Sequence, residues 1–304
     1  MKSFTLKSGY DDLSLAVAVS LPKDKPLAVI QLVHGMCGCK ERFRPLMNFL
    51  SDNGIVCIAA DLRGHGESVK DINDLGYFYS GGYKALVADI KTIVDWGLKE
   101  FCGLPYYLLG HSMGSLAARV YAKQNDSTLS GLIVCGSPSW NPLSVVGRFL
   151  TGIACLTGFG RSRSKLIQMF TSDVYNKKFV SEGTQAWTCS DPEARKSVRE
   201  NPLCNFRFTM NGANNLMKMM GETYCHKGWK VSQPTMPILF ISGSDDACMI
   251  SEQKFYNAVN FMHKVGYQNV SSLIYPKMRH EVLNEVGKQK VWSDVLDFIK
   301  GTQK

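Results

Sequence analysis

The feature that most constrains this chain is a Gly-His-Ser-Met-Gly pentad at residues 110–114. An apolar run at residues 106–109 precedes it and predicts a buried strand, while small and aliphatic residues of helical character follow it. A G-x-S-x-G sequence alone is common and often marks a glycine-rich turn. Between a strand and a helix it predicts a sharp turn that holds Ser112 in a strained backbone conformation, with its hydroxyl at the end of the strand. Ser112 is therefore the candidate nucleophile.

Strand and helix patterns alternate on both sides of this pentad. Continuous apolar runs at 27–33, 55–60 and 129–135 are typical of parallel strands that helices cover on both faces. We therefore predict the α/β class, with a mostly parallel sheet and helices on both faces. Residues 3–7 and 13–20 alternate instead, and predict an antiparallel hairpin.

The alternation stops at residue 139 and resumes at residue 234. The segment between them carries helical patterns at 143–157, 165–170 and 214–220 but no convincing strand. These limits predict a core of residues 1–138 and 234–304 that is interrupted by a helical cap, residues 139–233. The cap leaves the sheet at the edge where Ser112 emerges, so we expect it to act as a lid over the site.

Serine is a weak nucleophile until a histidine takes its proton and a carboxylate orients that histidine. In an open parallel sheet such groups lie in loops at the carboxyl ends of strands. Two late loops fit, because Asp245 and Asp246 follow one predicted strand and His280 follows the next. The chain order serine, aspartate, histidine is that of the α/β-hydrolases.

An oxyanion that forms during acyl transfer needs two backbone N–H donors. One is expected from Met113, directly after the nucleophile, and the other from Met36, which follows His34 and Gly35 at the end of an early strand. A His-Gly pair alone is a simple strand-ending turn. Its position after a core strand, with a triad downstream, favours the oxyanion hole.

The motifs together resemble the bacterial lysophospholipase/monoglyceride lipase family of α/β-hydrolases. The similar segments are His-Gly-Met at 34–36, Asp-Leu-Arg-Gly-His-Gly-Glu-Ser at 61–68, the pentad at 110–114, Gly-Ser-Asp-Asp at 243–246, residues 278–285 and, in the cap, residues 201–209. The resemblance implies the α/β-hydrolase fold with an inserted cap and ester hydrolysis of acyl glycerols or lysolipids without a metal. Its Gly-x-x-Asp spacing implies that Asp246, rather than Asp245, is the acid of the triad.

Two departures from the family's pattern lie near the predicted oxyanion hole. The family usually carries Glu-His shortly after His-Gly-Met, where this chain has Gly38 and Cys39, and a histidine is common where Leu62 stands. Neither position belongs to the triad, so we expect catalysis to survive. The shape and polarity of the pocket, and with them the substrate, are open at this point.

The formal net charge is +9, and most of the excess of Lys and Arg lies between residues 139 and 237. Such a segment attracts an anionic lipid surface, lipid aggregates or an acidic substrate, or is simply a solvated face, and composition leaves these open. Arg161, Arg163 and Lys165 are the residues expected to meet lipid. No nucleic-acid partner is expected.

The ten cysteines are scattered without the spacing of metal ligands, and no signal-peptide core precedes them. We therefore expect reduced thiols, a cytoplasmic protein, no metal and no cofactor.

The favoured interpretation is a serine ester hydrolase for a small mono-acyl ester. The alternatives are a non-lipid carboxylesterase or small-amide (aminopeptidase-type) hydrolase, and a catalytically silent binding protein on the same fold. The residues predicted to line the substrate pocket are His34, Cys37, Phe149, Phe170, Met217 and Met220.

Overall fold

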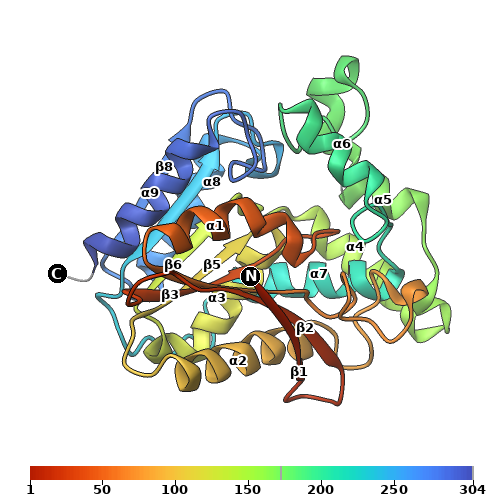
Figure 1. The fold of residues 1–304 in the computed structure, drawn as a ribbon. Coiled ribbons are helices and arrows are strands. Elements are labelled where there is room, and N and C mark those ends of the chain that lie inside the picture. The colour runs from red at the N-terminus through yellow and green to blue at the C-terminus, as the bar shows by residue number, and fades with distance from the viewer. Residues whose placement is uncertain (172, 303–304) are drawn as a thin grey trace.

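The computed structural model describes residues 1–171 and 173–302, and an eight-stranded sheet runs through it (Figure 1). The strand order is β1-β2-β4-β3-β5-β6-β7-β8. Within the described residues, the pairs β1–β2 and β2–β4 are antiparallel and the other five pairs are parallel, so the predicted hairpin and the mostly parallel sheet are both confirmed. The strands are β1 (Lys2–Lys7), β2 (Ser14–Ser20), β3 (Ala28–Val33), β4 (Ile55–Ala60), β5 (Tyr106–His111), β6 (Gly131–Cys135), β7 (Ile238–Gly243) and β8 (Val270–Tyr275).

Helices cover both faces of the sheet, and the central strands are therefore buried on both sides. Every residue of β3, β4 and β6 is buried, which explains their continuous apolar runs. One face packs against α1 (Arg44–Asp52) and α9 (Lys288–Gly301). The other packs against α2 (Gly82–Glu100), α3 (Met113–Asn125) and α8 (Glu252–Lys264). Figure 1 shows α1 and α2 on opposite sides of the sheet.

The segment between β6 and β7 is helical in the residues that the structure describes. It contains α4 (Leu143–Leu156), α5 (Lys165–Thr171), α6 (Pro192–Glu200) and α7 (Met210–Thr223). The sequence patterns predicted α4 and α5 closely but gave only half of α7 and missed α6. Short 3₁₀ helices are η1 (Lys40–Phe43), η2 (Ile72–Asp74), η3 (Asp126–Thr128), η4 (Phe159–Arg161), η5 (Asp173–Glu182) and η6 (Ala247–Met249).

Helix α7 joins the cap to the core. Met219 is fully buried within the core cluster, and the Thr223 hydroxyl donates to the Leu116 carbonyl of α3 at 3.2 Å. The Tyr83 N–H of α2 donates to Asn215 at 3.0 Å. The predicted cap, residues 139–233, therefore includes a helix that packs on the core, α7, whereas α4, α5 and α6 lie farther out (Figure 1).

Among the described residues, no helix combines the length and the apolar character needed to cross a membrane.

Candidate active site

Ser112 occupies the sharp turn between β5 and α3. Its backbone angles are φ 54° and ψ −121°, a conformation that residues other than glycine rarely adopt. The turn brings α3 so close to β3 that a Cβ on Gly114 would lie 2.2 Å from the Val33 carbonyl oxygen. The second glycine of the pentad is thus required by packing, and the turn places Ser112 at the carboxyl end of the sheet.

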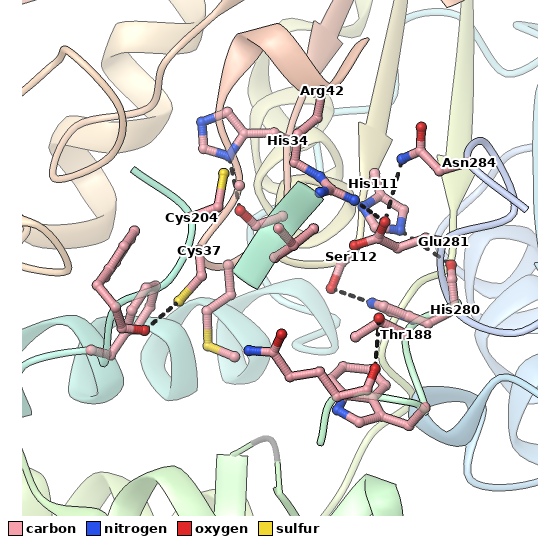
Figure 2. Close-up of a pocket in the computed structure, with 18 of the residues that line it drawn as sticks. His34, Cys37, Arg42, His111, Ser112, Thr188, Cys204, His280, Glu281 and Asn284 are labelled. Atoms are coloured by element: carbon pink, nitrogen blue, oxygen red, sulfur yellow. Dashed lines mark hydrogen bonds and ion pairs between the residues drawn. The ribbon is translucent and has the colours of Figure 1, made fainter. Parts of the chain in front are cut away.

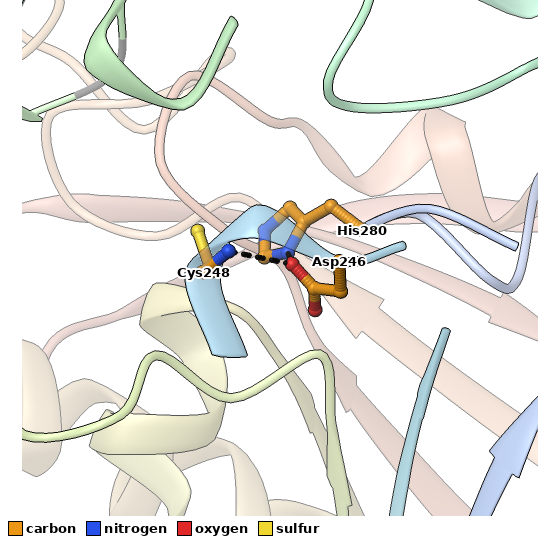
Figure 3. A group of neighbouring side chains, drawn as sticks. All are labelled: Asp246, Cys248 and His280. Carbon is orange, nitrogen blue, oxygen red and sulfur yellow. Dashed lines mark hydrogen bonds and ion pairs between the residues drawn. The ribbon is translucent and has the colours of Figure 1, made fainter. Parts of the chain in front are cut away.

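Ser112, His280 and Asp246 form one hydrogen-bonded chain, although they lie in three separate loops. His280 Nε2 lies 2.8 Å from the Ser112 Oγ, and His280 Nδ1 lies 2.9 Å from the Asp246 Oδ1 (Figures 2 and 3). Asp246 in turn accepts hydrogen bonds from the Ser242 hydroxyl at 2.8 Å and from the Cys248 N–H at 2.9 Å. This is the order of contacts that a serine nucleophile, its base and an orienting carboxylate require.

The neighbouring carboxylate, Asp245, is exposed, whereas Asp246 is buried. Of the two aspartates, Asp246 is the one whose carboxylate bonds His280. The Asp245 N–H instead anchors the same loop by donating to the Met278 carbonyl at 2.9 Å. The geometry therefore brings Asp246 against His280, the same one of the two adjacent aspartates that the Gly-x-x-Asp spacing of the family implied.

Burial and the ion pair with Asp246 have opposite effects on the pKa of His280. Burial alone would lower the pKa of the imidazole, but the Asp246 carboxylate raises that pKa well above its ordinary value of 6.5. Burial would likewise raise the pKa of Asp246, and contact with His280, together with hydrogen bonds from Ser242 and Cys248, lowers it instead. The pair stabilises an imidazolium, which is the species a base becomes when it accepts the serine proton.

The loop that follows β3 lies against Ser112. A Cβ on Gly35 would sit 2.8 Å from the Ser112 Cβ, and Met36 lines the cavity beside it. The Gly35 carbonyl accepts bonds from His34 Nδ1 at 2.8 Å and from the Gly38 N–H at 3.1 Å. Because C=O and N–H of a trans peptide point in opposite directions, the Met36 N–H is directed away from the His34 ring.

The second predicted donor, Met113, is the first residue of α3. The first N–H groups of a helix have no acceptor within the helix, so this donor is not consumed by α3 itself. Met113 directly follows Ser112, and the arrangement suits a two-donor oxyanion site.

His34 lies in the wall of the cavity, but backbone groups occupy both of its ring nitrogens. Nδ1 bonds the Gly35 carbonyl, and Nε2 accepts the Leu62 N–H at 2.9 Å. Burial lowers the pKa of His34 to about 4, so the ring is neutral at pH 7. His34 therefore positions the loop that carries Met36, and it has no ring nitrogen left for a substrate.

A cavity of about 120 Å³ opens over Ser112, and the core and the cap line it together (Figure 2). Of the six predicted pocket residues, His34 and Cys37 line it, and the Cys37 thiol donates to the Phe206 carbonyl at 3.2 Å. The side chain of Phe170 lies outside the described part of the chain. Three predicted residues are not part of this lining: Phe149, Met217 and Met220.

Packing explains why those three lie elsewhere. Met217 faces α4, where a Cβ on Gly147 would lie 2.6 Å from its sulfur, and Met220 packs against the core. Phe149 is 68% exposed on α4. The methionine stripe of α7 therefore serves the contacts of α7 with α4 and the core.

Comparison with known proteins identifies the family of this chain. The profile of the serine aminopeptidase S33 family matches residues 24–287. The chain belongs to this family. A monoacylglycerol lipase of Mycolicibacterium smegmatis is 23% identical, over 96% of this chain and 95% of the lipase. Human monoglyceride lipase is 30% identical over a shorter stretch, which covers 37% of this chain and 36% of the human protein. The predicted family is thereby confirmed.

Solved structures of an esterase and a lipase share the fold. A thermostable carboxyl esterase from Bacillus coagulans superposes with a TM-score of 0.90 at 25% identity, covering 99% of this chain and 98% of the esterase. A soluble variant of the Saccharomyces cerevisiae monoglyceride lipase gives a TM-score of 0.78 at 18% identity, over 99% of this chain and 94% of the lipase. The predicted α/β-hydrolase fold is confirmed.

In this member of the S33 family, the cap contributes an aromatic cover over the base, which sequence reasoning missed. The Trp187 ring lies 4.9 Å from the His280 ring, centroid to centroid, and Trp187 is buried. The segment is fixed to the histidine loop because the Glu281 N–H donates to the Thr188 carbonyl at 2.7 Å. Trp187 lies in an irregular stretch with no periodicity, so no pattern could have pointed to it.

An ion pair beside the triad was also missed. Arg42 pairs with Glu281, and Asn284 donates to the same carboxylate at 3.3 Å. Burial would raise the pKa of Glu281, but the Arg42 guanidinium holds it below its usual value. His111 lies beneath, with Nε2 3.2 Å from the His280 carbonyl, so it supports the backbone of the base.

One group of possible metal ligands occurs among the described residues, and it coincides with the triad. Donor atoms of Asp246, Cys248 and His280 lie within 4.8 Å of one another (Figure 3). The ring nitrogen of His280 and the carboxylate of Asp246 already bond each other, and burial raises the pKa of the Cys248 thiol, which keeps it protonated. A thiol must lose its proton to bind a metal, so this set suits the triad and not a metal site.

Proposed function

We propose that the chain is a serine hydrolase of mono-acyl esters, in which Ser112 is the nucleophile, His280 the base and Asp246 the orienting carboxylate. The observation that carries the proposal is the 2.8 Å contact between the Ser112 Oγ and His280 Nε2 at the floor of a cavity. His280 takes the serine proton as Ser112 attacks the ester carbonyl, and the Met36 and Met113 N–H groups receive the oxyanion. His280 then protonates the leaving alcohol, and a water molecule releases the acid.

Two kinds of side chain around the cavity support this substrate class. Met36, Phe206 and Leu283 offer apolar contacts suited to an acyl chain, while Arg42 and Asn284 lie near the triad, where an alcohol or glycerol head group would leave. The full-length similarity to a monoacylglycerol lipase supports the same class.

The aminopeptidase alternative needs a carboxylate that is free to bind the substrate's amino group. Among the cavity-lining residues that the structure describes, Glu281 is the only carboxylate, and Arg42 already neutralises it. A buried ion pair is costly to break, so Glu281 is a poor partner for an ammonium group. We therefore favour esters over amino-terminal peptides.

A substrate panel tests the proposal. Purified protein is assayed with p-nitrophenyl esters from acetate to palmitate, a monoacylglycerol, a lysophospholipid and an amino-acid p-nitroanilide. We expect ester turnover with a preference for monoacylglycerol or lysophospholipid over the anilide. Efficient anilide cleavage without ester hydrolysis would support the peptidase alternative, and turnover of short esters alone would support a non-lipid carboxylesterase.

We also propose that the cap, residues 139–233, contacts lipid aggregates or an anionic membrane surface. Apolar side chains cover the outer side of α4 and its C-terminal turn, including Leu143 at 65% exposure and Leu156 at 90%. Of the exposed cations, Arg148 lies on this helix, Lys218 lies on α7, which packs against it, and Lys165 lies on α5. Apolar burial and attraction to anionic head groups then act together.

Two of the three basic residues that were expected to meet lipid, Arg161 and Arg163, already bond to the loop around η2. Arg161 pairs with Asp74 although it is exposed, and the Arg163 guanidinium donates to the carbonyls of Asn73 and Leu75 at 2.8 Å. Both anchor the cap to the η2 loop, so substituting them would disturb packing as well as charge. The leucines of α4 give a cleaner test.

The double variant Leu150→Ser/Leu156→Ser is expected to bind anionic vesicles at least about tenfold more weakly, because burying one leucine contributes roughly 1.5–3 kcal/mol. Hydrolysis of emulsified monoacylglycerol should fall with it, while soluble p-nitrophenyl butyrate should be hydrolysed as before. Vesicle co-sedimentation measures the binding. Leu273→Ser, which removes an exposed leucine on the distant strand β8, is the matched control. Equal binding by both variants would contradict the proposed contact.

A further inference from the structure

Two buried thiols from distant parts of the chain meet where the cap joins the core. The Cys39 and Cys204 sulfurs lie 3.5 Å apart, although the residues are 165 positions apart in sequence. Cys39 lies between the loop that carries Met36 and η1, and Cys204 lies in the turn between α6 and α7. Cys204 also lines the cavity, near His34 in Figure 2, so a small solute that enters the cavity reaches this member of the pair, and the Cys39 sulfur lies 3.5 Å from it.

The two sulfurs are chemically unequal. The hydrogen bond from Cys204 lowers the pKa of Cys39, even though burial works in the opposite direction. The backbone N–H groups of Glu41 and Arg42 favour the Cys39 thiolate further, whereas the pKa of Cys204 is raised. A thiolate is the reactive form of cysteine, so Cys39 is the attacking partner and Cys204 the protonated one.

The neighbouring thiols lack this arrangement. Cys37 donates to the Phe206 carbonyl at 3.2 Å, and Cys189 donates to the Asn284 carbonyl at 3.6 Å. Burial raises the pKa of each to about 12, which keeps both protonated. The reactive character is therefore confined to the pair of Cys39 and Cys204.

We propose that Cys39 and Cys204 are an oxidative modification site, at which a hydroperoxide converts the two thiols into a disulfide between core and cap. The Cys39 thiolate attacks the peroxide oxygen, the O–O bond breaks, and Cys39 becomes a sulfenic acid as one water or alcohol leaves. The Cys204 sulfur then attacks the Cys39 sulfur and displaces hydroxide, which leaves as water with the Cys204 proton. Two thiols thus lose two electrons and two protons, and the peroxide gains them.

The bond needs only a small local movement. A disulfide has a sulfur–sulfur distance of about 2.05 Å, so the two sulfurs must approach by about 1.5 Å from their present contact of 3.5 Å. Once formed, the bond fixes the turn before α7 to the loop beside Ser112. The cap could then no longer move away from that loop to admit a bulky acyl substrate.

Peptide mapping after oxidation tests the proposal. Reduced protein is treated with hydrogen peroxide, remaining thiols are alkylated, and the unreduced digest is analysed by mass spectrometry. We expect a cross-linked peptide pair that fragmentation assigns to Cys39 and Cys204, and that dithiothreitol removes. Cys39→Ser and Cys204→Ser should each abolish it, whereas Cys102→Ser, at an exposed cysteine, should leave it unchanged.

Two functional readouts accompany the mapping. The oxidised protein should melt at a higher temperature than the reduced protein, and this shift should be absent in Cys39→Ser. Peroxide should also cause a loss of long-chain ester hydrolysis that dithiothreitol restores and that Cys39→Ser does not show. This last readout rests on the proposed function, whereas the mapping and melting results hold even if no ester is cleaved.

Two results would overturn the proposal. One is that Cys39 and Cys204 are both recovered alkylated at a peroxide dose that oxidises the exposed Cys102. The other is a cross-link from Cys39 to Cys37 or Cys189 in place of Cys204.

Discussion

Replacing Ser112 by alanine is expected to lower kcat/KM for p-nitrophenyl butyrate by at least about 10³-fold, and His280→Ala should have an effect of similar size. The two side chains act as one unit through their 2.8 Å contact, so the double variant should be little worse than either single variant. Steady-state kinetics on all three proteins measure this.

The control for these variants is an exposed serine of the cap. Ser197→Ala removes a hydroxyl that bonds only within α6, to the Ala194 carbonyl, and it should leave kcat/KM unchanged. Circular dichroism and the melting temperature establish that each protein is folded. If His280→Ala kept near wild-type turnover, or if the two losses multiplied in the double variant, the assignment of the base would be wrong.

Asp246→Asn is expected to lower kcat by about 10²- to 10⁴-fold, because the amide leaves the imidazole in the wrong tautomer and no longer stabilises its charged form. Asp245→Asn, one residue away and exposed, is the matched control and should leave kcat almost unchanged. Rates at saturating substrate measure both. The reverse ranking would move the acid to Asp245.

The pH dependence of activity provides a second test of the role of Asp246. His280 must be deprotonated to accept the serine proton, so activity should rise with pH as His280 loses its proton. The Asp246 carboxylate raises the pKa of His280 above 6.5, so the acid limb of the profile, where activity rises with pH, should lie above pH 6.5. Without the carboxylate, the limb in Asp246→Asn should move to lower pH. An unchanged limb in that variant would show that another group controls it.

The fold was predictable because its strands carry two distinct patterns. Complete burial of β3, β4 and β6 favours apolar residues at nearly every position, whereas the edge strand β1 alternates between exposed and half-buried residues over most of its length. The loops of Asp246 and His280 were also predictable, since parallel strands bring their carboxyl ends to one edge. Sequence order alone therefore indicated which side chains converge.

The pocket was less predictable because periodicity shows which face of a helix is apolar but not what covers that face. The methionines of α7 have helical spacing, yet Met217 packs against Gly147 of α4. Helix α6 is strongly charged and was missed, although Asp191 before Pro192 is a start signal: its carboxylate accepts the Glu193 N–H at 2.9 Å. The cytoplasmic location stays a prediction.

The most direct test of the account is covalent labelling with a fluorophosphonate, which reacts with a serine only when a base and an oxyanion hole activate it. We expect a single adduct that peptide mapping assigns to Ser112, with no labelling of Ser112→Ala or of heat-unfolded protein. A folded protein that stays unlabelled, or an adduct on another serine, would contradict the claim that Ser112 is the nucleophile.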